Sequence, residues 1–575
     1  MSKSKQNIQS IVQFGLLLGI ILLINILANA RFGNTALYGS LDLTEEKRFT
    51  LTDGTKELLR DLDEVVTIEV MLAGKDLPAN YKRLRESIQQ TLSDFRSISG
   101  YVEYRFVDPM AGDSEQDLRV QQELAKQGIY PVQNRVQQAD EVSLKIIYPY
   151  ARFYYKGREA AVNLLYNQVP GMPQEAVLEN SIGLLEYQLA NMIQKLQTPG
   201  RRNVVFTTGH GELTPLETAD LEQSLRAFYN TDRLNLNEVV QIDPEIAAII
   251  VAKPQFAFSE RDKFKIDQYV MNGGKVLWLI DALRANLDSL RGTEDYIATD
   301  YQLNLDNLLF NYGIRIQPNL VLDLQHTRIP LNTGRLGNAN QTELFGYPYH
   351  LAVIPTSNHP IVKGLNPLNL KFASSIDTTS RTKTDLERTV LLSSSPRTRM
   401  QYNPIRLNFD FLQRELPREQ FNKGEQPLAI AIEGTFPSLY ENRVTETMLA
   451  GLDEMGMTFK TSSVPNRMVV VADGDIARSQ VNYEEGTFMP LGFNDFEKYQ
   501  FSNKYFLINA IEYLLDTQGL LEARGKEVKL RLLDETRALQ EKSYWQLLNI
   551  GLPLVFLFLV GWAYNFVRKR RFGRQ

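Results

Sequence analysis

Two apolar segments lie at opposite ends of this chain of 575 residues, Ile8–Ala30 and Trp545–Val567. Each is long enough to cross a bilayer, because a transmembrane helix needs about 20 consecutive apolar residues. Basic residues flank both segments on their outer sides, and such residues stay on the cytoplasmic side. They are Lys3 and Lys5 before the first segment and Arg568, Lys569, Arg570, Arg571 and Arg574 after the second. The sequence therefore predicts a two-pass membrane protein with both termini cytoplasmic and residues from about 32 to 544 outside the cytoplasm.

The first segment has an alternative interpretation as a cleaved signal peptide. Ala28-Asn29-Ala30 resembles a small-residue cleavage site, but the apolar core of a signal peptide typically has only about 7–15 residues. The length of this segment favours an anchor. Asn25 and Asn29 are polar, and polar side chains in a membrane helix hydrogen-bond to a neighbouring helix. They predict a partner that packs against this face.

The second segment has aromatic residues at both ends, with Trp545 at one interface and Trp562 and Tyr564 towards the other. Aromatic belts of this kind mark the two surfaces of a bilayer. The basic run that follows acts as a stop-transfer signal. The same run alone would also fit a nuclear signal or a nucleic-acid patch, but its position directly after an apolar helix disfavours that interpretation.

Composition excludes several classes of site. The chain has no cysteine, so disulfides, thiolate metal sites and cysteine nucleophiles are excluded. The formal charge is −5. Seven of the basic residues lie in the two flanks, so the region between the apolar segments is more negatively charged than the whole chain. A surface of that sign repels nucleic acid, which is bound through a basic footprint. We expect no nucleic-acid partner, no cofactor and no metal.

The residues between the two segments predict two domains, because single cores stop growing at about 250–300 residues. In the first, Thr52 caps a short helix to Leu62. Strands and helices then alternate before a hairpin that turns at Lys156-Gly157. The expected elements are strand 65–72, helix 81–98, strand 101–107, helix 114–127, strand 142–148 and hairpin strands 152–155 and 160–164. This order predicts a thioredoxin-like domain, without the CxxC motif that redox chemistry requires.

The second domain reads as an α/β succession that begins with a buried strand at Asn203 and a glycine-bracketed loop. Helices alternating with short apolar strands predict a doubly wound parallel sheet, like that of class I glutamine amidotransferases. The expected elements are helix 216–229, strand 247–252, helix 259–271, strand 275–280, strands 390–394, 428–433 and 468–472, and helix 503–515. We expect an irregular insertion around Thr327–Tyr349.

The predicted organisation is α/β throughout, with both domains between two transmembrane helices. Its boundaries are transmembrane helix 8–30, thioredoxin-like domain 32–173, linker helix 174–200, α/β flavodoxin- or amidotransferase-like domain 201–520, membrane-proximal linker 521–544, transmembrane helix 545–567 and basic tail 568–575.

Polar residues follow four strands of the second domain, where ligands of open α/β sheets bind. They are Thr208, His210, Glu212, Lys253, Asp281, Asp473 and Asp475. As an enzyme site, His210 would be a base and the acids would be metal ligands or orienting groups. The structural interpretation, which we favour, makes Gly209 and Gly211 a tight turn and the acids caps of the following helices.

Familiar catalytic patterns are missing. A sheet of this type could hold a class I glutamine amidotransferase site, but that site needs a cysteine nucleophile. GxSxG and GxxxxGK[ST] patterns are absent, which removes the hydrolase elbow and the phosphate loop. His326, His350 and His359 lack a ligand spacing such as HExxH. With no ATP-binding motif, energy for any transport must come from a partner chain.

The combination and order of several short motifs resemble the GldG family of gliding-motility-associated auxiliary, substrate-binding-like components of ABC transporters, found in Bacteroidota. The matching pieces, between an N-terminal and a C-terminal anchor, are Asp42–Thr52, Tyr104–Pro109, Thr207–Glu212, Asn272–Val276 and Val471–Asp475. The likeness spans nearly the whole chain, and its specificity comes from the order of the pieces.

The resemblance implies a subunit in the inner membrane, with its bulk in the periplasm, that works with a permease and a cytoplasmic ATPase. It implies a link to gliding and to secretion of surface proteins, and it assigns no catalytic residues. We therefore expect a non-enzymatic subunit. The alternatives are an extracytoplasmic receptor for a glycan, peptide or lipid and, third, a hydrolase that uses the strand-end pocket.

Overall fold

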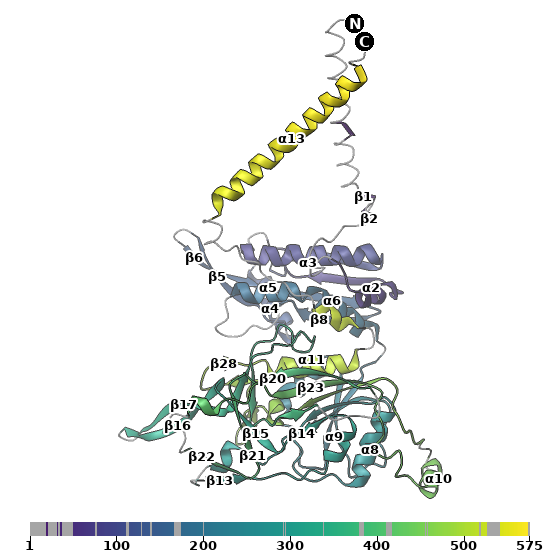
Figure 1. Ribbon diagram of the computed structural model, residues 1–575, viewed down its shortest axis with the longest axis vertical. Helices are drawn as coiled ribbons and strands as arrows, with labels where there is room; N and C mark the ends of the chain where they lie inside the picture. The colour runs from purple at the N-terminus through teal and green to yellow at the C-terminus, as the bar shows by residue number, and fades with distance from the viewer. Residues whose placement is uncertain are drawn as a thin grey trace. The chain divides into compact units, whose positions relative to one another are not determined.

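The computed structural model describes residues 50–525 and 541–572 with short gaps, together with residues 19–20, 31–32 and 35–36 (Figure 1). The gaps are at 75–76, 111–113, 128, 139–140, 166–173, 199, 291–292, 294, 337–338, 379–384, 410–416, 455, 457 and 517–518. The chain divides into two compact units, Met1–Glu527 and Val528–Gln575. Apart from residues 19–20, the first apolar segment lies outside the described residues, and so do Asn25 and Asn29.

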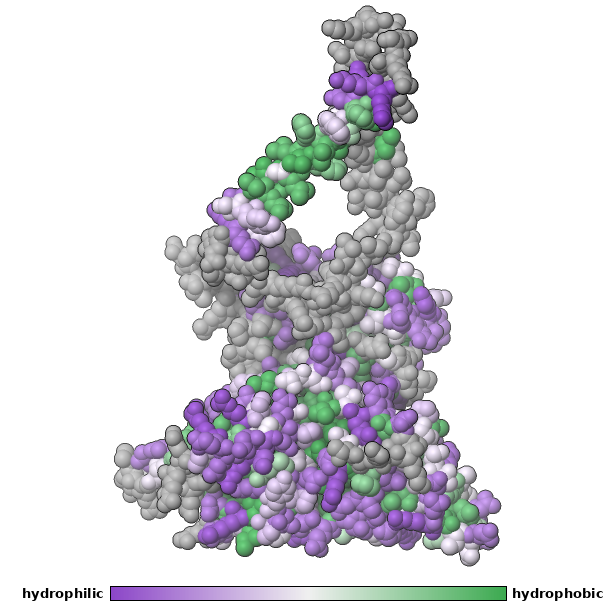
Figure 2. Space-filling view, in the orientation of Figure 1, coloured by the Kyte–Doolittle hydropathy of each residue, from purple (hydrophilic) through white to green (hydrophobic). Residues whose placement is uncertain are grey.

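The second unit is built on α13 (Lys542–Phe572), which contains the predicted segment 545–567 and Pro553. Its residues Lys542–Arg570 are long and apolar enough to cross a membrane, and none of this stretch is buried. It is the one such helix among the described residues. Figure 2 shows a continuous hydrophobic surface along α13 with hydrophilic residues at both ends. A helix that is apolar on all sides and exposed is stable in lipid rather than in water, so the chain is associated with a membrane.

The first domain contains a four-stranded sheet with helices packed on it. Strand β3 is parallel to β4 and antiparallel to β7, which pairs with β8, so a parallel unit precedes an antiparallel pair, as predicted. The elements are α2 (Asp53–Arg60), β3 (Val66–Val70), α3 (Ala79–Ile98), β4 (Val102–Phe106), α4 (Ser114–Lys126), β5 (Val132–Gln138), β6 (Glu141–Ile147), β7 (Tyr150–Tyr155) and β8 (Arg158–Asn163). The thioredoxin-like assignment itself stays a prediction.

Local signals explain several boundaries of this domain. Thr52 accepts a hydrogen bond from the backbone N–H of Thr55 and so caps α2. The β7–β8 hairpin turns where predicted, because Lys156 and Gly157 both adopt a positive φ, of 48° and 72°, as a two-residue hairpin turn requires. The buried side of α3 repeats every three or four residues, at Tyr81, Leu84, Ile88, Leu92 and Phe95, and packs on the sheet.

The predicted linker helix is two helices, α5 (Gln174–Gly183) and α6 (Leu185–Gln197). Much of α6 is buried in the core of the first domain, including Leu189 and Ile193. The opposite side of α6 meets the second domain, where Lys195 Nζ lies 2.7 Å from Glu512 Oε1. This segment is therefore packed on both sides, whereas a free linker would be solvated.

The second domain is built on a seven-stranded mixed sheet, and this corrects the prediction of a purely parallel one. Six of its strands run in one direction, and β23 runs antiparallel to them, between its neighbours β24 and β20. The spatial order is β10 (Asn230–Asn235), β9 (Asn203–Thr208), β11 (Ile246–Ala252), β12 (Lys275–Leu279), β24 (Asn466–Val471), β23 (Pro427–Gly434) and β20 (Glu387–Ser393).

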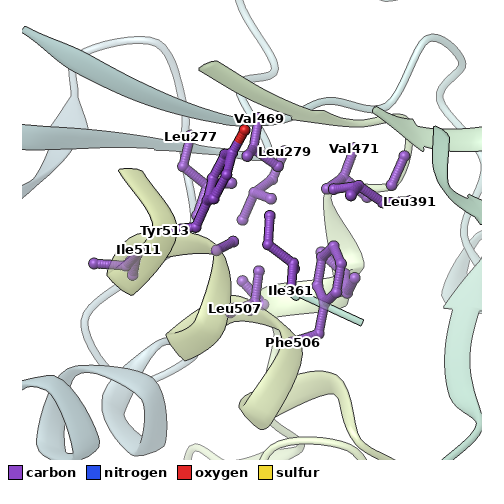
Figure 3. Packing of buried hydrophobic residues seen from close by; sticks show 14 of the residues in the cluster. Leu277, Leu279, Ile361, Leu391, Val469, Val471, Phe506, Leu507, Ile511 and Tyr513 are labelled. Atoms are coloured by element: carbon purple, nitrogen blue, oxygen red, sulfur yellow. The ribbon is translucent and has the colours of Figure 1, made fainter. Parts of the chain in front are cut away.

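Helices cover both faces of this sheet because successive strand residues point to opposite sides. On one face, Leu277, Val469 and Val471 pack against Leu507 and Ile511 of α11, as Figure 3 shows. The helices of that face are α7 (Ala219–Arg226) and α11 (Asn503–Leu515). The other face carries a second core and the helices α8 (Glu260–Met271) and α9 (Asp306–Asn311).

The region predicted to be an irregular insertion is instead a long antiparallel hairpin of β16 (His326–Leu336) and β17 (Ala339–Val353), with β18 (Leu368–Lys371) paired to β17. Part of β17 does alternate, with Tyr347, Tyr349 and Leu351 buried in the core. The sequence between Asn332 and Thr342 is mostly polar, however, so the pattern that identifies a strand is weak there. Shorter antiparallel pairs join β13 (Asp295–Ala298) to β22 (Ile405–Asn408), β14 (Arg315–Ile316) to β19 (Ile376–Asp377) and β15 (Asn319–Asp323) to β21 (Thr398–Tyr402).

Candidate functional site

Four of the predicted site residues come together as a buried charge cluster at the carboxyl ends of three adjacent parallel strands. Lys253 follows β11, Asp281 follows β12, and Asp473 and Asp475 follow β24. Lys253 Nζ lies 3.0 Å from Asp281 Oδ2 and 2.6 Å from Asp475 Oδ2. All four side chains are buried. The ammonium group therefore occupies the position between two carboxylates that a bound cation would otherwise take.

The backbone around this cluster is fitted closely to Lys253. Lys253 has a φ of 55°, which is uncommon for a residue other than glycine. A Cβ atom on Gly474 would lie 2.6 Å from Lys253 Cβ and 2.9 Å from its Cα. Asp281 also accepts a hydrogen bond from the Gly474 backbone N–H. The glycine therefore allows two strand ends to approach closely enough for the ion pairs to form.

Protonation differs among the acids of the cluster. Burial opposes the charge of Lys253, but the carboxylates of Asp281 and Asp475 outweigh it and raise the pKa of the ammonium. Asp473 accepts hydrogen bonds from the backbone N–H groups of Lys371 and Asp475, both at 2.8 Å. Burial, together with the neighbouring Asp281 and Asp475, raises the pKa of Asp473 well above its usual range. Burial also raises the pKa of Asp281, whereas at Asp475 burial is outweighed by Lys253 and Arg478, which hold its pKa below its usual range.

His210 and Glu212 form a second cluster on the glycine-bracketed loop after β9. His210 Nε2 lies 3.4 Å from Asp262 Oδ2, and its ring stacks on Phe258 at 3.8 Å. Glu212 accepts hydrogen bonds from the His210 backbone N–H at 2.7 Å and from Thr207 Oγ1 at 3.0 Å. Burial raises the pKa of Glu212, but its hydrogen bonds with His210 outweigh burial and lower the pKa overall.

The backbone conformation of this loop requires glycine at two positions. Gly209 and Gly211 have φ values of 111° and 73°, which other residues rarely adopt. A Cβ atom on Gly211 would lie 2.8 Å from the ring of Phe256. The His210 carbonyl accepts hydrogen bonds from the backbone N–H groups of Gln255 and Phe256. The loop thus ties the end of β9 to the segment after β11, in line with the structural interpretation of the motif.

The remaining predicted residue, Thr208, ends β9, and its carbonyl accepts a hydrogen bond from the Leu236 N–H at 3.0 Å. His210 is only 2% exposed, so a substrate has no direct access to its ring. A general base must come within hydrogen-bond reach of the proton that it abstracts. The described residues contain no group of three or more side chains arranged to hold a metal ion. At these strand ends, the charged side chains pair with one another and the loop after β9 is held by hydrogen bonds.

Sequence reasoning missed the residues that line a cavity of about 120 Å³ beside the charge cluster. Asp475 is the one predicted site residue in its wall, and the other titratable side chains of the wall are Arg328, His350, Lys371 and Arg478. Arg478 lies three residues after Asp475, directly after the turn η4 (Asp475–Ala477), a spacing that could have indicated it. Lys371 and His350 belong to β18 and β17, and no sequence signal connects these strands to the cluster.

Comparison with known proteins gives two matches to families. Residues 201–510 match the family described as an ABC-type uncharacterized transport system, and residues 45–154 match a domain of unknown function. No curated protein matches the chain. A solved structure named mmIFT52 N-terminal domain is similar at 12% identity and a TM-score of 0.30, over 54% of this chain and 97% of that chain. A likeness this weak carries no argument.

Proposed function

We infer the function of this chain from its family: it belongs to the ABC-type uncharacterized transport system family, whose match spans residues 201–510. The chain is thus an auxiliary component associated with ABC transport. We propose that it is a non-catalytic subunit that works with a permease and a cytoplasmic ATPase in the inner membrane, with a role in gliding motility and surface-protein secretion. The family match carries the transport role, and the motif resemblance supports the gliding role.

Two features support a non-catalytic role within the described residues. The strand-end side chains pair with one another, because the Lys253 ammonium lies between two carboxylates. His210 is buried against Phe258 and lacks access to a substrate. An exposed membrane helix joined to a large α/β body suits a subunit that transmits or receives movement from a permease. The receptor alternative has its own support in the cavity beside Asp475.

Copurification from native membranes tests this role. We expect a stable complex with a permease and an ATPase. Asn25→Leu combined with Asn29→Leu should weaken this complex, because interhelical hydrogen bonds of these side chains would be lost. Insertion of the chain into the membrane should be unchanged. Leu18→Ile combined with Leu22→Ile, two apolar changes in the same segment, is the matched control. A chain that is monomeric in detergent and crosslinks to neither partner in native membranes contradicts the transporter-subunit role.

The proposed topology is tested by introducing single cysteines into this cysteine-free chain. We expect an impermeant thiol reagent applied to cells with a permeabilised outer membrane to label Ser259→Cys and to leave Ser2→Cys and Gln575→Cys unlabelled, because basic flanks stay in the cytoplasm. All three should react after full membrane lysis, which controls for thiol reactivity. Labelling of either terminus before lysis would show that this topology is wrong.

A further inference from the structure

The cavity of about 120 Å³ beside Asp475 is lined by β16, β17 and β18 and by residues between 475 and 503. Its wall carries three cationic side chains, Arg328, Lys371 and Arg478, and one carboxylate, Asp475. The carboxylate is already paired with Lys253 on its other side at 2.6 Å. The side chains that face the cavity therefore favour an anionic ligand.

Lys371 is the most informative of these residues. Its ammonium makes no ion pair within 4.0 Å in the part of the chain that the structure describes, although it lines the cavity from the end of β18. The other two cations differ: Arg478 lies 2.9 Å from Glu217 Oε1, and Arg328 lies 3.9 Å from Glu497 Oε1. Burial lowers the pKa of Lys371, although Asp475 and Asp473 attract its charge. A buried cation without a close ion pair is costly, and an anion in the cavity would reduce that cost.

Two buried polar atoms of the wall also lack hydrogen-bond partners among the described residues. They are His350 Nε2, on a side chain that is 5% exposed, and Asp475 Oδ1, which lies 3.6 Å from the Arg478 guanidinium. Burial lowers the pKa of His350 well below 6.5, so its ring is neutral and can donate one hydrogen bond. Unsatisfied buried polar atoms of this kind are rare in folded proteins and call for an explanation.

We propose that this cavity binds a phosphate group, with Lys371, Arg478 and His350 as hydrogen-bond donors to its oxygens. Guanidinium and ammonium groups together match the charge and the multiple acceptors of phosphate. The Oδ1 atom of Asp475 accepts a hydrogen bond from a protonated phosphate oxygen or from a neighbouring hydroxyl of the ligand. The same group occurs in soluble phosphate monoesters and in the headgroup of phosphatidic acid, so both are sources to be distinguished.

This assignment goes beyond the transport role and is tested without any partner. Isothermal titration of the purified full chain, in an uncharged detergent and at constant ionic strength, would use inorganic phosphate, glycerol 3-phosphate and short-chain phosphatidic acid, with chloride as the blank. We expect Lys371→Met to weaken binding by at least about tenfold, because a charge-assisted hydrogen bond is lost. Lys498→Met removes the same charge from an exposed site and should change the affinity less than about twofold.

The three probes separate the possible sources. Binding of the soluble phosphates assigns the site to a soluble ligand, and binding of phosphatidic acid alone assigns it to a lipid headgroup. Absence of binding by all three overturns the proposal, and so does Lys371→Met with wild-type affinity. If Lys371→Met does not fold, Arg478→Met takes its place, because Arg478 is also a proposed donor and its side chain is 30% exposed. Unchanged affinity in Arg478→Met together with unchanged affinity in His350→Gln likewise overturns the proposal.

Discussion

Replacing Lys253 with methionine is expected to lower the free energy of unfolding by about 3–5 kcal/mol, because removal of one partner leaves uncompensated charge inside the protein. Asp281 and Asp475 are both buried and both within 3.0 Å of the Lys253 ammonium. Without it they face each other as like charges. Methionine keeps most of the side-chain volume, so the loss would report the charge and not a cavity.

Urea unfolding of the purified full chain, followed by far-ultraviolet circular dichroism, measures this loss. Lys498→Met is the matched control, because its partner Asp495 is on the surface and exposed pairs contribute only about 0–1 kcal/mol. Adding Asp475→Asn to Lys253→Met should recover part of the stability, since the repulsion between the two buried carboxylates is then absent. A loss below about 1 kcal/mol for Lys253→Met would mean that the cluster is solvated.

The elements that the sequence predicts well are those with strong local signals. Helix α11 begins and ends at the predicted residues, Asn503 and Leu515, because apolar residues pack it against the sheet along most of its length. The sequence did not indicate β10, Asn230–Asn235, because an edge strand has neighbours on one side only and its residues NTDRLN are largely polar. Periodicity reports burial, so polar edge strands escape it.

The candidate site also has one part that the sequence predicts and another part that it does not. Lys253, Asp281 and Asp475 follow parallel strands, whose carboxyl ends share one edge of the sheet, and the structure places these three side chains together. The sequence could not show that one ammonium pairs with both carboxylates, because that depends on the backbone conformation of Lys253 and on Gly474. Lys371 is placed by the pairing of β18 with β17. Contacts between residues so far apart in the sequence depend on how the sheet packs, and residue spacing does not predict them.

Trp278 on β12 should show the second large effect, because it lies in the middle of the core beneath α8 and α9 and is fully buried. Truncation to alanine removes the whole indole and leaves a cavity, and such substitutions cost about 3–5 kcal/mol. The same urea titration, followed by circular dichroism, measures the loss. Lys253 directly follows β11, the strand next to β12. Truncation of Trp278 would therefore also disturb the sheet that carries the charge cluster.

Trp278→Phe separates volume from polarity at this position. The indole Nε1 has no hydrogen-bond partner among the described residues, so phenylalanine loses no hydrogen bond and removes an unsatisfied donor. We expect Trp278→Phe to cost clearly less than Trp278→Ala, because phenylalanine keeps an aromatic ring in the core and leaves a smaller cavity. Equal losses in the two variants would contradict the assignment, because they would require an interaction of the indole N–H. A clear difference between them would establish packing as the source of stability on this face of the sheet.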